Sequence, residues 1–137
     1  MTASQADVGA TAGPVEPATV LVVEDSPDIS HVLRLLLSRA GYTVHSVPDG
    51  EAAIRELGQL RPHVAIIDVQ LPGMSGLDLC RALRERLPDP PLVMLLTARA
   101  GENDAEAGRL AGAHAYVTKP FSNQELLLRL ETLLNGG

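Results

Sequence analysis

The sequence predicts an α/β protein in which five helices cover both faces of a doubly wound, five-stranded parallel sheet. Three observations support this fold class. Short apolar runs alternate five times with longer segments whose apolar residues recur at helical spacing. Most of these runs are continuous, which is typical of strands buried on both faces. Residues that cap, start or end helices lie at the joints between the segments.

The first strand is predicted at residues 20–23, where four branched apolar residues follow one another. Ser26, Pro27 and Asp28 then supply an N-cap, a proline for the first helical position and an acid for the first turn. Gly41 ends this helix. Its apolar stripe is expected to face the sheet and consists of Ile29, Val32, Leu33, Leu36, Leu37 and Ala40.

The same unit repeats along the chain. Further strands are predicted at residues 42–47, 64–67, 92–96 and 113–117, and further helices at 49–60 and 102–111, after residue 75 and after residue 122. Ser75 caps the third helix, and Ser122 or Asn123 caps the last. The helix at 102–111 is predicted to be the weakest because of Gly108 and Gly112. The inward stripes of the second, third and last helices consist of Ala53, Ile54 and Leu57; Leu79, Cys80, Leu83 and Leu87; and Leu126, Leu127, Leu130, Leu133 and Leu134.

Length and composition indicate one compact domain. The chain has 137 residues, and residues 19–135 carry the alternating pattern. Residues 1–18 are small, polar and rich in Pro and Gly, without an apolar period, so we expect a disordered N-terminal tail.

Charge and cysteine usage exclude several classes of protein. The net charge of −6 argues against a nucleic-acid surface, which needs clustered bases. Cys80 is the single cysteine, so an intramolecular disulfide and a multi-cysteine zinc site are excluded, and its place in a helix stripe indicates core packing. No apolar run has the length of a membrane span, and no basic n-region of a signal peptide is present. A soluble, cytoplasmic protein is therefore expected.

Polar residues follow the predicted strands where each one ends. Glu24 and Asp25 follow the first strand, Asp68 the third, Thr97 the fourth, and Lys119 closely follows the fifth. In open α/β sheets ligands bind outside the carboxyl ends of the strands. We therefore expect three carboxylates, a hydroxyl and an ammonium to meet at one edge of the sheet. Lys119 is also the one lysine beside ten arginines.

This group of residues suits phosphoryl chemistry. Clustered carboxylates repel one another and therefore favour a bound cation. Oxygen ligands without His or Cys favour a hard metal such as Mg²⁺. An ammonium and a hydroxyl at the same edge can stabilise the oxygens of a transferring phosphoryl group, and a carboxylate can act as the nucleophile.

The chain resembles the receiver domain of two-component response regulators over about residues 19–135. The matching stretches are VLVVEDSPDI, HVAIIDVQLPGMSGLDL, LVMLLTA and GAHAYVTKPF. The DVQLPGMSG segment is the most specific of them. The resemblance implies a flavodoxin-like fold with strand order 2-1-3-4-5.

The resemblance also implies a phosphoryl and metal site. Asp68 is expected to accept a phosphoryl group from the phosphohistidine of a histidine kinase. Asp25 and Asp68 are expected to bind Mg²⁺ directly, with the backbone carbonyl of Gln70 as the remaining protein ligand. Glu24 is expected to hold the metal through water.

Further residues match the family's switch. Thr97 is expected to bond a phosphoryl oxygen and move toward it, and Lys119 to pair with another oxygen. The Lys119–Pro120 peptide bond is expected to be cis. Tyr116 matches the aromatic residue that turns inward when Thr97 moves.

Gln70 and Arg99 lie where receivers tune the lifetime of the phosphoryl group. A Gln can orient the attacking water or shield the phosphoryl group from it, and an Arg can hold the anion. The four histidines are scattered and none is interpreted as a phosphodonor; His114 is expected to be a surface residue at a strand end.

The leading hypothesis is a phosphorylation-activated switch of a two-component phosphorelay that changes the face made by the fourth helix, fifth strand and fifth helix. Its chemistry would be self-phosphorylation and autodephosphorylation, not catalysis on a separate substrate. One alternative is a receiver-like interaction module that works without phosphorylation. Another is a small α/β phosphatase or nucleotide-binding enzyme, but no P-loop or dinucleotide-binding glycine motif is present.

The expected partners are a histidine kinase or phosphotransfer protein and a downstream protein or fused effector. No direct contact with nucleic acid or membrane is expected of this domain. A phosphorylation-dependent homodimer is compatible with the resemblance. Asn135, Gly136 and Gly137 follow the last predicted helix, so the chain is expected to be either a stand-alone receiver or part of a longer regulator or hybrid kinase.

Overall fold

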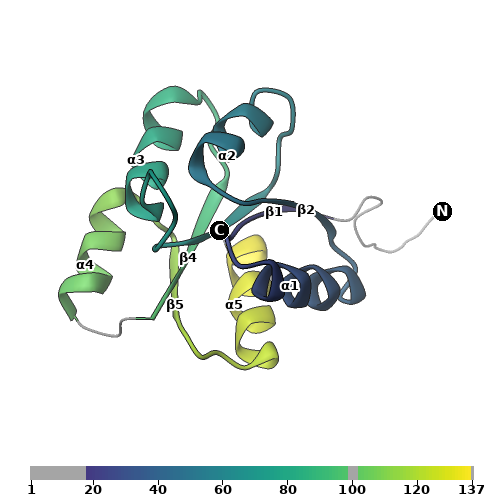
Figure 1. Ribbon diagram of the computed structural model, residues 1–137. Coiled ribbons are helices and arrows are strands. Elements are labelled where there is room, and N and C mark those ends of the chain that lie inside the picture. The colour runs from purple at the N-terminus through teal and green to yellow at the C-terminus, as the bar shows by residue number, and fades with distance from the viewer. Residues whose placement is uncertain (1–17, 99–101, 137) are drawn as a thin grey trace.

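The computed structural model describes residues 18–98 and 102–136 and has the predicted fold class. Five parallel strands form one sheet in the order β2-β1-β3-β4-β5, and helices cover both faces (Figure 1). The elements in chain order are β1 (Thr19–Val23), α1 (Pro27–Arg39), β2 (Thr43–Val47), α2 (Gly50–Glu56), β3 (Val64–Asp68), α3 (Gly76–Arg86), β4 (Leu92–Thr97), α4 (Glu102–Ala111), β5 (Ala115–Thr118) and α5 (Asn123–Gly136).

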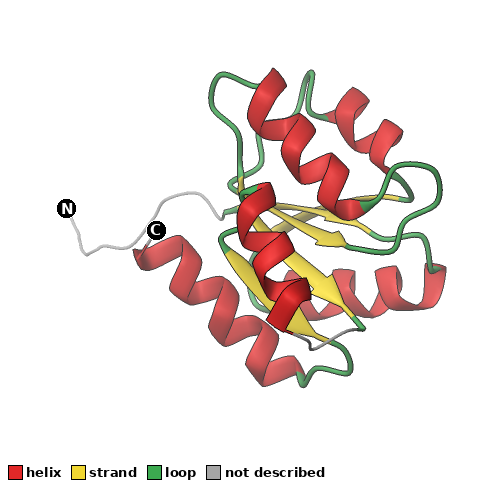
Figure 2. Cartoon of the chain, turned by 90° about the vertical axis from the view of Figure 1, so that its left-hand side faces the viewer, coloured by secondary structure: helices red, strands yellow, loops and turns green. Residues whose placement is uncertain are grey.

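The helices form two layers, one on each side of the sheet (Figure 2). Successive residues of a strand point to opposite faces, so each strand contributes to two cores. The core under α1 and α5 consists of Val20, Val22, Leu33, Leu37, Val64, Ile66, Met94, Leu96, Val117, Leu126 and Leu130. The core under α2, α3 and α4 consists of Leu21, Val23, Ala53, Leu57, Ala65, Ile67, Leu79, Cys80, Leu83, Val93, Leu95 and Ala111. Burial of Cys80 among these side chains agrees with the predicted packing role.

Helix caps form where the sequence predicted them. The side-chain oxygens of Ser26, Asp49 and Ser75 accept the backbone N–H groups of the first turns of α1, α2 and α3. For the last helix the structure selects Ser122, whose hydroxyl oxygen accepts the N–H of Glu125 at 3.0 Å.

Two predicted boundaries are wrong by several residues. Helix α2 ends at Glu56 and not at residue 60. The N–H of Leu57 still bonds Ala53, but those of Gly58 and Gln59 bond the carbonyls three residues earlier and tighten the chain into a turn. Strand β5 begins at Ala115 and not at residue 113. The N–H of Ala113 still bonds Gly108 at the end of α4, so this residue is not free to join the sheet.

Part of the predicted inward stripe of α1 is also wrong. Val32 is 52% exposed, and Ala40 is exposed as well. Val32 lies beside a surface groove that Ile29, Pro120 and Phe121 also line, so this side of α1 extends past the edge of the core. In residues 18–98 and 102–136, no helix combines the length and the apolar character that crossing a membrane requires.

Candidate functional site

The candidate site lies at the carboxyl edge of the sheet, where the strand order changes direction. Starting from β1, the chain adds β2 on one side and then β3, β4 and β5 on the other. Such switch points form the ligand crevice of open α/β sheets because the flanking loops diverge there. Glu24 follows β1, and Asp68 is the last residue of the adjacent β3, so their side chains flank this crevice.

Three carboxylates meet in the crevice. One oxygen atom from each of Glu24, Asp25 and Asp68 lies within 4.8 Å of the other two. Glu24 and Asp68 are only 3% and 5% exposed, whereas Asp25 is open to solvent. Two buried carboxylates this close destabilise each other unless a cation or a proton intervenes.

Glu24 shows the effect of this crowding. Its pKa is raised to about 7, chiefly by burial; the neighbouring Asp68 carboxylate also raises it, whereas the N–H of Ser26 and the charge of Lys119 act to lower it. The Oε2 atom of Glu24 accepts the Ser26 N–H at 3.1 Å. Near neutral pH the side chain is therefore poised between its neutral and ionised forms.

Lys119 supplies the cation from the other side of the crevice. Its Nζ atom donates to Asp68 Oδ2 at 2.8 Å and to Glu24 Oε1 at 3.4 Å. Burial acts to lower the pKa of Lys119, but the hydrogen bond and charge of Asp68 and the charge of Glu24 more than offset this and raise it. The ammonium is therefore held in its charged form between the two buried carboxylates.

The backbone around Lys119 ties it to β4. Its N–H donates to the carbonyl of Thr97 at 2.6 Å, so the chain stays bonded to the end of the neighbouring strand. The Lys119–Pro120 peptide bond is cis, as the resemblance implied.

The loop after Asp68 orients its carboxylate. Asp68 Oδ1 accepts the N–H of Gln70 at 3.0 Å, while Oδ2 accepts from Lys119. The loop returns to β3 at Gly76, whose N–H bonds the carbonyl of Val69. A Cβ atom at Gly76 would lie 2.2 Å from the Asp68 carbonyl oxygen, so only glycine allows this approach.

Gly76 is a site residue that the sequence reasoning did not single out. A signal for it was present, because glycine is a poor helix former and here directly follows the predicted N-cap Ser75. The role of Ser26 was likewise incomplete, since it caps α1 and also donates to Glu24.

Thr97 and Tyr116 border one hollow next to the crevice. Thr97 is 2% exposed at the end of β4, and Tyr116 is half-buried on β5. Together with the loop after β3, including Gln70 and Ser75, they line a cavity of about 390 Å³. A Cβ atom at Gly108 would lie 3.2 Å from the Tyr116 ring, so α4 packs closely on this side chain.

The structure thus brings Glu24, Asp25, Asp68 and Lys119 together, with Thr97 bonded to the backbone of Lys119. The side chain of Gln70 is exposed above them, and Tyr116 lies across the neighbouring cavity. Arg99 lies outside the described residues.

The donor set fits a hard divalent cation. It consists of carboxylate oxygens from three residues, whose negative charge a cation would neutralise. The acidic cluster is therefore compatible with Mg²⁺.

Comparison with known proteins agrees with this geometry. The family model of the response regulator receiver domain matches residues 20–131. The two-component response regulator PhoP of Pseudomonas aeruginosa is 44% identical over 115 residues, which cover 84% of this chain and 51% of PhoP. The chain spans about half the length of the curated relatives it matches.

Solved structures are similar as well. The receiver domain of a signal transduction histidine kinase from Syntrophus aciditrophicus is 36% identical, with a TM-score of 0.80 and coverage of 87% of this chain and 91% of that one. The response regulator TrrA from Thermotoga maritima, in complex with Mg²⁺ and BeF, is 30% identical, with a TM-score of 0.76 and coverage of 85% and 98%. With its strand order and its acidic crevice, the chain belongs to the receiver domains of two-component response regulators.

Proposed function

We propose that Asp68 accepts a phosphoryl group from a histidine kinase or phosphotransfer protein and that this event switches the domain. The supporting observation is the Lys119 ammonium 2.8 Å from Asp68 Oδ2 inside a cluster of three carboxylates. An oxygen of the Asp68 carboxylate attacks the phosphorus atom of phosphohistidine. The P–N bond breaks, and the imidazole leaves with its electron pair, which produces an aspartyl phosphate.

The residues of the crevice position this reaction. Asp25 and Asp68 would hold Mg²⁺ directly with the backbone carbonyl of Gln70, and Glu24 would hold it through water. When bound, this cation supplies neutralising charge for the phosphoryl oxygens. The proposal is supported by the oxygen-only donor set and by the Mg²⁺ and BeF complex of the similar TrrA.

Thr97 and Lys119 then respond to the new negative charge. Phosphorylation adds about 1.5 to 2 negative charges and new acceptor oxygens at Asp68. Lys119, already hydrogen-bonded to Asp68, pairs with one of these oxygens, and the Thr97 hydroxyl donates to another. By resemblance to other receivers, Gln70 and Arg99 tune its autodephosphorylation, the only hydrolysis that we assign to the domain.

The signal passes from Thr97 to Tyr116 and then to the surface formed by α4, β5 and α5. The cavity that both side chains line provides room for the Tyr116 ring to turn inward. Because α4 packs on this ring at Gly108, an inward turn alters the support of α4. We propose that this surface controls a downstream protein, a fused effector or a homodimer, in the cytoplasm.

Intact mass spectrometry tests the phosphorylation step. The protein is incubated with Mg²⁺ and acetyl phosphate as a small phosphodonor. We expect a gain of one phosphoryl group, lost in Asp68→Asn and kept in the control Asp89→Asn, which changes an exposed loop carboxylate. No gain in the wild-type protein would favour the phosphorylation-independent interaction module.

Amide hydrogen exchange with and without beryllofluoride tests the switch. We expect altered exchange in peptides that cover residues 97–121, and unchanged exchange there would contradict the proposed output path. The lifetime of the phosphoryl group in Gln70→Ala and the wild-type protein decides separately whether this side chain tunes hydrolysis, since an equal lifetime removes it from the proposal.

A further inference from the structure

Two histidines make the same unusual pairing at the amino edge of the sheet, opposite the phosphorylation site. His63 directly precedes β3, and its Nδ1 atom accepts the N–H of Thr19 at 2.9 Å. His114 precedes β5, and its Nδ1 atom accepts the N–H of Val93 at 3.0 Å. In each pair the histidine backbone N–H donates in return to the carbonyl of Thr19 or Val93, at 2.8 Å in both cases.

Each imidazole takes the place of a backbone carbonyl. In a parallel ladder, a residue makes two bonds to the neighbouring strand. Its carbonyl accepts from the N–H of one residue there, and its own N–H donates to the carbonyl of the residue two positions earlier. For Thr19 and Val93 these carbonyls would belong to Arg61 and Gly112. Both positions lie in loops that enter the strands, and Gly112 has a φ of +102° at the end of α4. The histidine side chain just before β3 or β5 therefore accepts the bond that a backbone carbonyl would otherwise accept.

This pairing requires an uncharged imidazole. A neutral histidine can accept at Nδ1 while Nε2 carries the hydrogen, whereas a protonated histidine carries hydrogens on both nitrogens and cannot accept. Val93 is only 1% exposed, so its N–H would lose a partner in a place that water does not reach.

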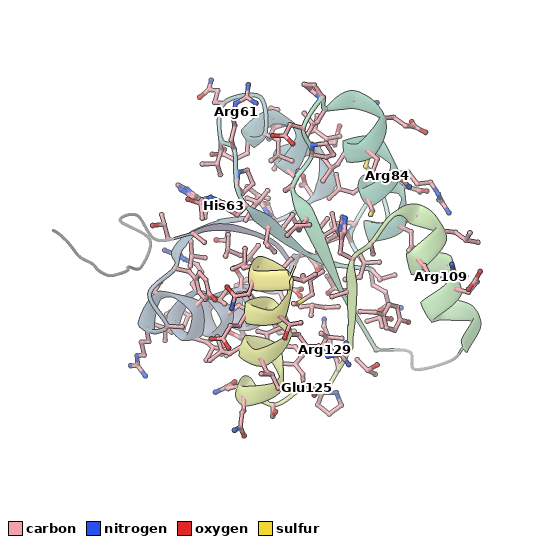
Figure 3. All side chains as sticks on the ribbon, turned by 180° about the vertical axis from the view of Figure 1, so that it is seen from behind. Arg61, His63, Arg84, Arg109, Glu125 and Arg129 are labelled. Atoms are coloured by element: carbon pink, nitrogen blue, oxygen red, sulfur yellow. The ribbon has the colours of Figure 1, made fainter. Side chains whose placement is uncertain are left out.

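Two arginines lie beside His114. His114 lines a surface hollow of about 300 Å³ together with Arg109 of α4, Arg129 of α5 and Tyr116 of β5. Figure 3 shows Arg109 and Arg129 on the helices that flank β5. The charged groups that line this hollow from α4 and α5 are therefore both cations.

Arg61 is the charged residue nearest to His63 in the sequence. Arg61 precedes it in its own loop, and Figure 3 shows both side chains at this end of the sheet. Asp89, in the loop that leads to β4, lines one hollow with Arg61, and Glu131 on α5 acts on Tyr42 just before β2. Among the side chains that the structure describes, in residues 18–98 and 106–136, no ion pair joins a carboxylate to His63 or His114.

We propose that His63 and His114 are acid-sensitive latches that close the amino edge of the sheet at the β1–β3 and β4–β5 ladders. Protonation of either imidazole releases its bond, because both ring nitrogens then carry hydrogens. The His114 latch also fastens the short connection from α4 to β5, so its release loosens the attachment of α4. This device acts without phosphorylation and is independent of the chemistry at Asp68.

Urea unfolding at about pH 7.5 and about pH 5.5 tests the latches, because histidine titrates between these values. His63→Asn and His114→Asn are matched variants, since the Asn Oδ1 atom is as many bonds from Cα as the His Nδ1 atom but does not titrate. The native state with its latches closed cannot take up the protons that the unfolded chain binds at low pH. Acidification should therefore raise the equilibrium constant for unfolding more in the wild-type protein than in either Asn variant. The additional increase should be about tenfold for each latch.

His31→Asn, at an exposed position of α1, is the control and should keep the wild-type pH dependence. Parallel pH dependences in the wild-type protein and in the double variant His63→Asn/His114→Asn would overturn the proposal.

NMR of the wild-type protein provides a second measurement that needs no variant. At the higher pH, the Nδ1 atoms of His63 and His114 should be unprotonated and their Nε2 atoms protonated. At the lower pH, hydrogen-exchange protection of the Thr19 and Val93 amides should fall relative to that of Leu95, inside β4. A hydrogen on Nδ1 at the higher pH, or protection that stays in constant proportion to that of Leu95, would overturn the proposal.

Discussion

The buried carboxyl of Glu24 makes the stability of the metal-free protein dependent on pH. Its pKa is about 7 in the folded protein and 4.5 for an ordinary glutamate. The folded state therefore holds a proton over a range in which the unfolded chain has released it. Stability from this group is fully present below the ordinary pKa and is lost as the pH rises through about 7. The substitution Glu24→Gln keeps a neutral side chain of the same size at all these pH values.

The size of the effect follows from the difference in pKa. The unfolded chain releases the Glu24 proton more readily than the folded protein does. Compared with a side chain that stays neutral, Glu24 therefore lowers the free energy of unfolding by about 1 kcal/mol at about pH 5 and by about 3 kcal/mol at about pH 8. Because Gln does not ionise, Glu24→Gln should gain stability relative to the wild-type protein by about 2 kcal/mol across this range. The other titrating groups are common to both proteins and cancel in the comparison.

Urea unfolding in the presence of EDTA, at several values across this range, measures the difference. Glu85→Gln, which changes an exposed glutamate on α3, is the control and should follow the wild-type curve. If Glu24→Gln and the wild-type protein lose or gain stability in parallel with pH, burial and Asp68 do not raise the pKa of Glu24 as the geometry implies.

Three further predictions follow from the same contacts. Mg²⁺ binding near neutral pH should release a proton from Glu24, visible in calorimetry as a binding heat that varies with the ionisation enthalpy of the buffer; equal heats in all buffers contradict this. Lys119→Arg keeps the positive charge but replaces the compact ammonium that lies between two carboxylates. The variant should therefore show a smaller beryllofluoride-induced difference in amide exchange than the wild-type protein. An equal difference would show that charge alone suffices. Gly76→Ala places a Cβ atom 2.2 Å from the carbonyl oxygen of Asp68 and should lower the free energy of unfolding by about 1 to 3 kcal/mol. The control Gly136→Ala adds a Cβ atom that meets no atom within 4 Å, so its stability should not change. Equal urea midpoints for the two variants would refute the close approach at Gly76.

The fold could be predicted from local patterns because each pattern reports its own environment. The run at residues 20–23 and the cap at Ser26 set the start of the alternation, and they keep these roles in the structure. Boundaries were predicted less well where they depend on distant bonds. The late start of β5 results from the bond of Ala113 to α4, and the exposed Val32 lines a groove together with Pro120 and Phe121, far along the chain.

For the site, the order of the elements was informative on its own. Parallel strands bring their carboxyl ends to one edge, so the positions of Glu24, Asp68 and Lys119 in the sequence were enough to predict that they meet. Residue type then indicated a hard cation and phosphoryl chemistry.

Tertiary structure decided how these groups interact. Only the packed sheet places Lys119 closer to Asp68 than to Glu24, buries Glu24 enough to raise its pKa, and brings Gly76 against the Asp68 backbone. The same holds at the opposite edge, where His63 and His114 appeared scattered in the sequence and proved to be acceptors of the sheet. Which groups meet depends on chain order, but distance, burial and protonation depend on atoms that only the folded chain brings into contact.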